Sequence, residues 1–250
     1  MNFRPIFINR FKFGMKGAAL FMALLLLCNA FVVAMLLVAS AQVQGQAFSN
    51  FSVAMSCFTL AIGAASVRED LRLGIQNGVS RGTSLTAGFA ANIAVALVAA
   101  LGVTLVEWAC IYLRGAVRIG FYSIFALIYG EDAGVLGQLR SFLLNFLWCG
   151  SMVFVGSFLS LMYWRLTRFW RWVVSFVIGA AALLLFSSGV FLLISNAKTG
   201  SGFPAWLLET ARWLGEAPVN LCICLVGIAA VFAVFDWLLT RKAPITAATA

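Results

Sequence analysis

The sequence predicts an all-α membrane protein with six transmembrane helices, and three observations support that fold class. The chain is 63% hydrophobic and only 10% charged, whereas a soluble domain is about 25% charged. Its mean hydropathy is +1.03. No charged side chain occurs from Gly17 to Val67, and this run is long enough for two spans and a turn because one span needs about 20 apolar residues.

Windows without charge place the spans along the chain, because charged side chains are costly in hydrocarbon and collect in loops. These windows are 17–67, 82–106, 141–164, 172–197 and 217–235. The first window holds two spans and each of the others holds one. We therefore predict a single transmembrane domain over residues 1–250, with spans at about 17–39, 48–67, 84–113, 141–163, 172–195 and 218–239.

The distribution of Lys and Arg predicts the orientation, because basic residues favour the cytoplasmic side. One side collects Arg4, Arg10, Lys12, Lys16, Arg68, Arg72, Arg81, Arg165, Arg168, Arg171, Arg241 and Lys242. The other side has only Arg114, Arg118, Arg140, Lys198 and Arg212. Both termini are therefore expected in the cytoplasm. The net charge of +9 is expected to face anionic lipid head groups, and no nucleic-acid partner is needed to explain it.

Residues 1–16 interleave bulky apolar side chains, such as Phe3 and Phe7, with basic ones, such as Arg4 and Lys12. This composition predicts a short N-terminal helix that lies in the membrane interface, with its aromatic rings toward the lipid and its cations at the head groups. A plain basic anchor that only fixes the topology is a compatible alternative.

The segment 66–81 carries signals for a separate cytoplasmic helix between the second and third spans. Ser66 and Glu69 have the spacing of a capping box, in which each side chain satisfies a free backbone N–H of the other residue. Asn77 and Gly78 then tolerate the left-handed backbone that ends a helix. We therefore expect a helix of two to three turns here.

That helix is expected to be amphipathic. Val67, Leu71 and Ile75 recur every four residues and share one helical face. Thr83 or Ser84 is expected to cap the span that follows. The apolar face can dock on a partner protein, or the helix can simply lie on the lipid surface, and the residues alone leave both alternatives open.

Two segments between spans are rich in aromatic residues. The outer segment 114–140 is expected to hold an interfacial helix over about 121–129, which ends at 130–132. The segment 164–172 is expected to form a tight cytoplasmic turn with its aromatic rings at the head-group level. Membrane anchoring accounts for both segments.

The outer segment 196–217 separates the fifth and sixth spans. A Gly-rich stretch leads to Pro204, which suits the first turn of a helix. Trp206 and Trp213 then belong to an amphipathic stretch. We expect an outer helical segment that either lies on the membrane or dips into it.

The sequence lacks the residues of common catalytic and metal sites. It contains neither a GxxxxGK[ST] phosphate loop nor a GxSxG elbow. It has no His, which removes the usual metal ligand and general base. Its six cysteines lie in predicted spans, where packing explains them. We expect this chain to be no enzyme and to hold no cofactor or metal.

Few polar groups fall inside the predicted spans. Glu107 and Asp236 lie near span ends, and an intramembrane acid is a functional candidate, although Asp236 can instead pair with Arg241 or Lys242 at a helix end. Asn29, Asn92 and Asn145 lie nearest the middle of the membrane. They either form hydrogen bonds between helices or line a substrate path.

The layout resembles the membrane subunit of type-2 ABC exporters, with an N-terminal elbow helix, six spans, a cytoplasmic helix between spans two and three, and an outer helical segment between spans five and six. The stretch from Arg68-Glu69-Asp70-Leu71 to Gln76-Asn77-Gly78-Val79-Ser80-Arg81 is similar to the coupling-helix region of small permeases of this family in Gram-positive bacteria. Gly156-Ser157-Phe158 through Tyr163-Trp164-Arg165 resembles the end of span four in that group. The outer segment 114–140 is longer than a minimal permease needs.

The resemblance implies an ABC-transporter permease in the bacterial cell membrane that hydrolyses nothing itself. Its partners would be membrane lipid, a second permease chain, identical or related, and a separate ATPase subunit that holds ATP and Mg²⁺. The residues implied in docking the ATPase are Arg68, Glu69, Asp70, Leu71, Arg72, Ile75, Gln76, Asn77, Gly78 and Arg81. The ATPase would drive the spans between inward-open and outward-open packings.

Two other classes remain open from the residues. A six-span uptake component would bind a small vitamin-like molecule tightly and would need more polar groups in the membrane than the three Asn residues. A structural or immunity protein of the membrane would need no ATPase, and a capped cytoplasmic helix would then have no partner.

Overall fold

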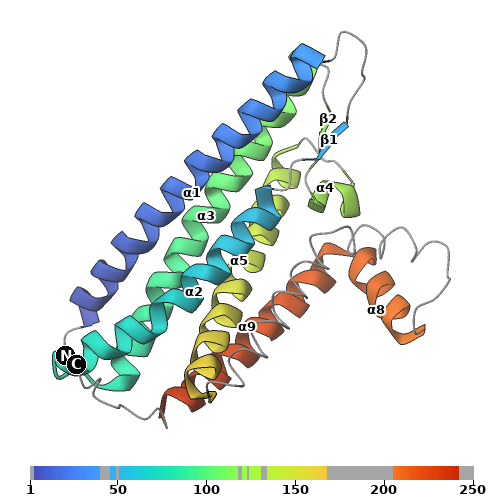
Figure 1. Ribbon diagram of the computed structural model, residues 1–250. Helices are drawn as coiled ribbons and strands as arrows, with labels where there is room; N and C mark the ends of the chain where they lie inside the picture. Colours follow the sequence, from blue (N-terminus) through green and yellow to red (C-terminus); the bar gives the residue numbers. More distant parts are fainter. Residues whose placement is uncertain are drawn as a thin grey trace.

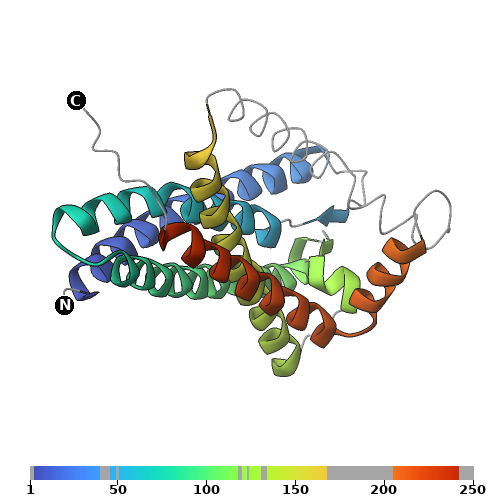
Figure 2. The ribbon, with the colours of Figure 1, turned by 90° about the horizontal axis from the view of Figure 1, so that it is seen from below.

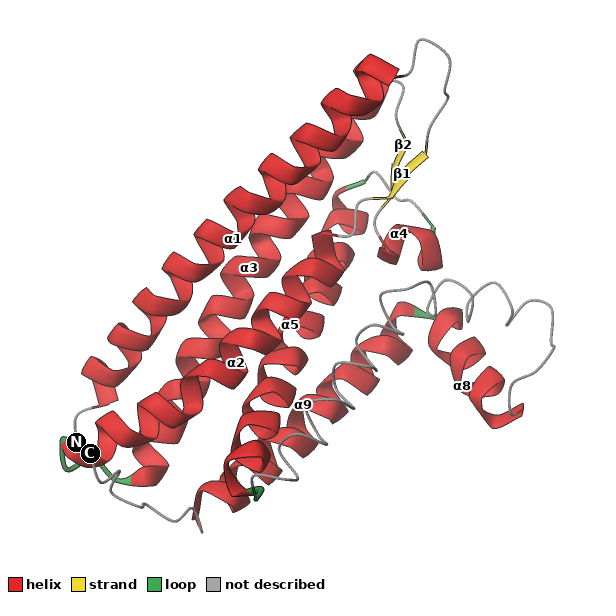
Figure 3. Ribbon diagram, viewed as in Figure 1, coloured by secondary structure: helices red, strands yellow, loops and turns green. Residues whose placement is uncertain are grey.

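The structure is a computed structural model that describes residues 3–39, 46–48, 51–117, 120–122, 124–130, 134–167 and 205–241. Almost all of these residues are helical (Figures 1 and 3). The long helices are α1 (Phe3–Ala39), α2 (Phe51–Gln76), α3 (Arg81–Val117), α5 (Val135–Arg165) and α9 (Pro218–Arg241), and the shorter ones are α4 (Ile124–Tyr129) and α8 (Ala205–Glu216). The predicted helical fold class is confirmed.

Five of the described helices, α1, α2, α3, α5 and α9, are long and apolar enough to cross a membrane. This indicates a membrane-embedded protein. The predicted span 172–195 lies outside the described residues, so the count of six spans stays a prediction. At 1.5 Å per residue, α1 and α3 are each about 55 Å long and exceed the roughly 30 Å of hydrocarbon, so they tilt or project beyond it.

The N-terminal interfacial helix is not a separate element, because α1 runs without a break from Phe3 to Ala39. Pro5 lies in the first turn, where a helix tolerates it. Gly14 lies so close to α3 that an added Cβ would meet the Val95 side chain. Arg10 is buried inside the bundle, with 4% of its surface exposed. The prediction of an elbow helix lying on the membrane is therefore wrong for the described residues 3–16, which pack as the first turns of α1.

Helices α2 and α5 form the most closely packed pair. A Cβ on Gly63 would fall against the Val153 carbonyl oxygen, and a Cβ on Gly156 would fall against the Leu60 carbonyl oxygen. The two backbones therefore touch where both helices lack a side chain, which is the packing that small residues permit in membrane helices. Ser157 adds a hydrogen bond from its Oγ to the Gly63 carbonyl oxygen at 3.4 Å.

The main core lies where α1, α2, α3 and α5 meet. Helix α3 contributes small side chains to it, including Ala96 and Ala99, and α2 contributes Met55. Helix α9 packs along α5 on the other side of the bundle, where Phe158 meets the rings of Phe232 and Phe235. Figures 1 and 2 agree in placing α1 beside α3 and α9 against α5.

One end of the bundle, the α2–α3 end, gathers the start of α1, the α2–α3 turn, and the last residues of α5 and α9 (Figure 1). Arg81 Nη1 donates to the Arg241 carbonyl oxygen at 3.4 Å. Arg165 Nη2 donates to the Leu239 carbonyl oxygen at 2.5 Å. The side chains of α3 and α5 therefore tie the end of α9 to the bundle.

The opposite end, the α8 end, contains α4, α8 and a short parallel ladder between β1 (Gln46–Phe48) and β2 (Gly120–Tyr122). Tyr129 Oη donates to the Leu214 carbonyl oxygen at 2.7 Å and joins α4 to α8. Helix α8 occupies part of the predicted outer segment 196–217. The link from β1 to β2 connects the segments that follow α1 and α3.

The expected interfacial helix at 121–129 is shorter than predicted. Phe121 and Tyr122 belong to β2, and α4 begins only at Ile124. The helix ends at Gly130, whose φ of +82° is the left-handed backbone that Gly adopts readily. Helix α5 then begins at Val135, six residues before the start predicted for that span, because the aliphatic run before Arg140 continues the helix.

Candidate functional site

The predicted coupling segment is the end of α2 rather than a separate helix. Ser66 lies in mid-helix, and its Oγ donates to the Gly63 carbonyl oxygen at 2.9 Å, so it does not cap a new helix. The capping-box prediction is therefore wrong. The predicted stop is confirmed, because α2 ends at Gln76 and Gly78 takes a φ of +68°.

The α2–α3 turn is held by its own hydrogen bonds. Val79 N donates to the Gly74 carbonyl oxygen at 2.8 Å, and Gly78 N donates to the Ile75 carbonyl oxygen at 3.0 Å, so carbonyl groups at the end of α2 are satisfied. Ser80 caps α3 by accepting the Thr83 N–H at 3.2 Å.

The cap predicted at Thr83 or Ser84 is wrong because α3 begins earlier, at Arg81. Ser84 instead donates its Oγ to the Asp70 carbonyl oxygen at 2.8 Å. This bond links α3 to the end of α2 and makes the turn part of a packed helix pair.

The apolar face of the segment points into the protein. Val67 and Leu71 are 5% and 3% exposed and pack with Leu161 of α5, against which Trp164 and Leu239 are also packed. Leu71 therefore does not lie on a surface that a partner could reach, and the expectation of docking through this apolar face is corrected.

The opposite side of the same segment is open. Arg72, Leu73, Gln76, Asn77 and Gly78 are exposed, and Ile75 is half-buried. The structure does not describe the side chains of Arg68 and Glu69. The reachable part of the predicted docking residues is thus the polar side of the last turn of α2 together with the α2–α3 turn.

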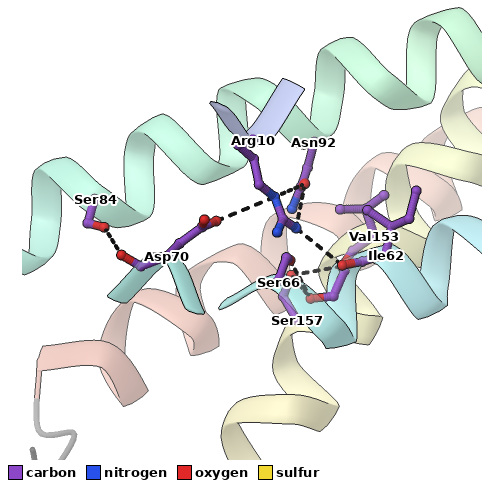
Figure 4. A network of polar contacts seen from close by, with 9 residues as sticks. Arg10, Ile62, Ser66, Asp70, Ser84, Asn92, Val153 and Ser157 are labelled. Atoms are coloured by element: carbon purple, nitrogen blue, oxygen red, sulfur yellow. Dashed lines mark hydrogen bonds and ion pairs between the residues drawn. The ribbon is translucent and has the colours of Figure 1, made fainter. Parts of the chain in front are cut away.

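A largely buried polar cluster lies between α1 and the two helices that flank this turn (Figure 4). We name it the Arg10 cluster, and it comprises Arg10 of α1, Asp70 of α2 and Asn92 of α3. Arg10 Nε lies 3.4 Å from Asp70 Oδ2. Arg10 also donates to Asn92 Oδ1 from Nε at 3.1 Å and from Nη2 at 3.0 Å, and to the Ile62 carbonyl oxygen at 3.2 Å.

The Arg10 cluster contains an ion pair. A cation on α1 meets a carboxylate on α2, and the amide of Asn92 accepts two of the guanidinium donors. Removing one member of such a buried pair leaves the other charge uncompensated, which is strongly destabilising. The cluster therefore ties three helices together behind the α2–α3 turn.

The three Asn residues considered for a substrate path do not gather in one place. Asn92 belongs to the Arg10 cluster. Asn29 donates from Nδ2 to the Leu25 carbonyl oxygen of its own helix at 2.9 Å. Asn145 lies in a second buried cluster near Glu107. On α3, Asn92 and Glu107 are separated by about 22 Å of helix, at 1.5 Å per residue.

We name this second group the Glu107 cluster. It comprises Ser52 of α2, Thr104 and Glu107 of α3, and Asn145 of α5, all of them buried. Ser52 Oγ donates to Glu107 Oε1 at 2.6 Å. Asn145 Nδ2 lies 3.4 Å from both Glu107 Oε2 and Thr104 Oγ1. The predicted intramembrane acid thus sits among neutral polar groups from three helices.

The expected pairing of Asp236 with Arg241 is not present. The Arg241 guanidinium carbon lies 4.4 Å from the centroid of the Trp237 ring. Asp236 is fully buried, and neither carboxylate oxygen has a hydrogen-bond partner within the described part of the chain. No group of three or more His, Cys, Asp or Glu residues that could hold a metal occurs among the described residues.

Sequence reasoning missed Arg10, Ser52 and Thr104. Arg10 was grouped with the other N-terminal cations, and nothing in its neighbours distinguishes it from Lys12. The spacing of Thr104 and Glu107 is the one available signal, because residues three apart share a helix face. The partners on other helices cannot be read from such spacing.

Comparison of the chain with protein-family models, curated proteins and solved structures found no match.

Proposed function

We propose that this chain is the membrane subunit of an ATP-driven ABC exporter and that it docks a separate ATPase through the exposed side of the α2–α3 turn. The docking surface consists of Arg72, Leu73, Gln76, Asn77 and Gly78. The observation that carries the proposal is that this exposed turn is fixed by hydrogen bonds and anchored to neighbouring helices. Such a turn can transmit a displacement from a docked partner to the helices without changing its own conformation.

The position of the turn supports this role. After Val67, the last charge-free residue of the run, α2 continues for nine residues to Gln76, which is about 13 Å of helix. The exposed part of α2 at its end is polar or charged, apart from Leu73, so it suits a water-facing surface. The turn lies at the α2–α3 end, where the exposed cations Arg4, Arg165 and Arg241 also lie, and this is the charge pattern of a cytoplasmic face.

The anchoring supports transmission to the spans. Behind the turn, the Arg10 cluster joins α2 to α1 and α3, Ser84 joins α3 to α2, and Arg81 joins α3 to α9. A displacement of the turn therefore moves several helices together. In this account ATP binding by the partner changes which of two helix packings is more stable, and cargo is released when the outward-open packing prevails.

Affinity purification of the tagged chain from its native membrane, in mild detergent, tests the proposal. We expect a stoichiometric ATP-binding subunit to be recovered with the chain. The charge reversal Arg72→Glu should remove that subunit, while Arg212→Glu, an equal charge reversal on the exposed surface of α8 at the other end, should leave it bound.

Three outcomes would overturn the proposal. Recovery of the chain alone, under conditions that preserve known membrane complexes, would favour a membrane protein that works without an ATPase. Recovery with a tightly bound small molecule and no ATPase would favour a substrate-binding uptake component. Equal retention of the ATPase by both variants, each checked for an unchanged unfolding temperature, would place the docking surface elsewhere.

A further inference from the structure

The Glu107 cluster contains more oxygen atoms than donors to satisfy them. Glu107 is 5% exposed. Its carboxylate accepts hydrogen bonds from the Ser52 hydroxyl at 2.6 Å and from the Asn145 amide at 3.4 Å. Asn145 is 1% exposed, and its Oδ1 accepts no hydrogen bond from any described residue. A buried acceptor without a donor is unfavourable, so this arrangement indicates a group that the described residues do not supply.

The charge of the cluster indicates that the missing group is positively charged. Among the described residues, no basic side chain forms an ion pair with Glu107, whereas Asp70 has Arg10. The titratable neighbours of Glu107 in this part of the chain are the thiols of Cys110 on α3 and Cys149 on α5, which bring no positive charge. An isolated carboxylate in a membrane interior is costly unless a positive charge neutralises it.

We propose that the Glu107 cluster is a binding site for one monovalent cation, either a proton on the carboxylate or Na⁺ held among the side-chain oxygens. Hard cations prefer carboxylate, amide and hydroxyl oxygens, and the cluster offers all three kinds from α2, α3 and α5. Rotation of the Asn145 amide exchanges its Nδ2 and Oδ1, which turns the unpartnered oxygen toward Glu107 and Thr104. This site is independent of the proposed docking function.

Binding would also act on the packing of the helices. Ser52, Glu107 and Asn145 belong to three different helices, so a cation that contacts them favours the packing in which those helices lie close together. A change in proton or Na⁺ concentration then shifts the balance between packings by the difference in affinity.

Chemical modification by dicyclohexylcarbodiimide tests the proposal, because this apolar reagent reacts with protonated carboxyl groups. The full-length chain is treated at mildly acidic and mildly alkaline pH, in NaCl or in choline chloride of equal ionic strength. The modified fraction of the peptide that contains Glu107 is then measured by mass spectrometry. Asp70, paired with Arg10, serves as the internal control and should stay unmodified.

Two results support the site and distinguish its occupants. Modification of Glu107 that rises several-fold at acidic pH and ignores Na⁺ identifies a proton site. If NaCl lowers the modification of Glu107 several-fold and choline chloride does not, the cluster is a Na⁺ site. In the second case Asn145→Leu should abolish the Na⁺ protection, while Asn29→Leu, which removes an amide bonded to its own helix, should keep it.

A second readout covers the case in which the reagent fails to reach Glu107. The unfolding temperature of the wild-type chain is measured across the same pH values and salts, beside that of Glu107→Gln. We expect the wild type to respond to pH or Na⁺ and the variant to lose that response. An unmodified Glu107, together with equal responses of the two proteins, overturns the proposal.

Discussion

The Arg10 cluster and the Glu107 cluster are built alike but differ in charge. Each places a carboxylate group at a junction of three helices, and each uses an Asn side chain as a hydrogen-bonding partner. In the Arg10 cluster the cation is supplied by α1. In the Glu107 cluster no cation is supplied within the described residues.

This difference separates a site that stabilises the bundle from a site that can exchange a cation with the solution. A carboxylate with its own guanidinium forms a permanent tie, and it suits the end where a rigid turn is exposed. A carboxylate with only neutral partners needs a cation from the solution to neutralise its charge. We therefore expect the α2–α3 end to behave as a fixed unit and the Glu107 cluster to respond to its surroundings.

The largest expected effect comes from breaking the ion pair. Arg10→Gln leaves the Asp70 carboxylate without its guanidinium, and we expect a loss of about 3–5 kcal/mol in the free energy of unfolding. The double variant Arg10→Gln with Asp70→Asn removes both charges and should recover a good part of that loss. Unfolding in mixed micelles measures both. If the double variant loses the sum of the two single effects, Arg10 and Asp70 do not act as a pair.

A smaller effect is expected from separating α2 and α5. In Gly156→Ala the new Cβ meets the Leu60 carbonyl oxygen, and such overpacking costs about 1–3 kcal/mol. Helix α5 contributes Asn145 to the Glu107 cluster but nothing to the Arg10 cluster, so carbodiimide modification of Glu107 should change while Asp70 stays unmodified.

The matched control is Gly150→Ala, because a Cβ at Gly150 has no neighbouring atom within 4 Å. That variant should unfold like the wild type or slightly later, since Ala favours the helix over Gly. Equal destabilisation by the two substitutions would argue against a special closeness of α2 and α5 at Gly156.

The hydroxyl of Ser52 offers a finer test of the Glu107 cluster. Ser52→Ala removes its shortest hydrogen bond, at 2.6 Å, and should cost about 1–2 kcal/mol. Ser56→Ala is the control on the same helix, because that buried hydroxyl donates to the Val53 carbonyl oxygen one turn away in its own helix. Unfolding free energies of the two variants give the comparison, and an equal loss would mean that Ser52 does nothing particular for Glu107.

The smallest effect on stability is expected at the exposed turn. Arg72→Glu changes a solvent-facing side chain and should alter the unfolding free energy by no more than about 0.5 kcal/mol. A large loss would show that Arg72 supports the fold, and its effect on partner binding could then not be assigned to docking.

The sequence allowed much of this organisation to be predicted. Charge-free windows located α1, α2, α3, α5 and α9 because hydrocarbon excludes charge over lengths that a helix must cross. The end of α2 at Gln76 followed from the tolerance of positive φ at Gly78. Local chemistry of this kind acts within a few residues and can be read from one chain.

The errors arose where packing between helices decided the outcome. Ser66 and Glu69 fit a cap, yet α2 continues because Val67 and Leu71 gain burial against α5. Arg10 resembled a surface cation, but its partners Asp70 and Asn92 are more than fifty residues away in the chain. Likewise, nothing in the neighbours of Glu107 indicates Ser52 or Asn145, so the composition of both clusters required the three-dimensional structure.

The most direct measurement compares two substitutions that each replace a carboxylate with an amide of nearly the same shape. Asp70→Asn and Glu107→Gln are unfolded side by side at mildly alkaline pH in choline chloride. We expect opposite results, with a clear loss of stability for Asp70→Asn, which removes the carboxylate paired with Arg10, and equal or higher stability for Glu107→Gln. A similar loss in both variants would contradict this expectation, because Glu107 would then be as well neutralised as Asp70.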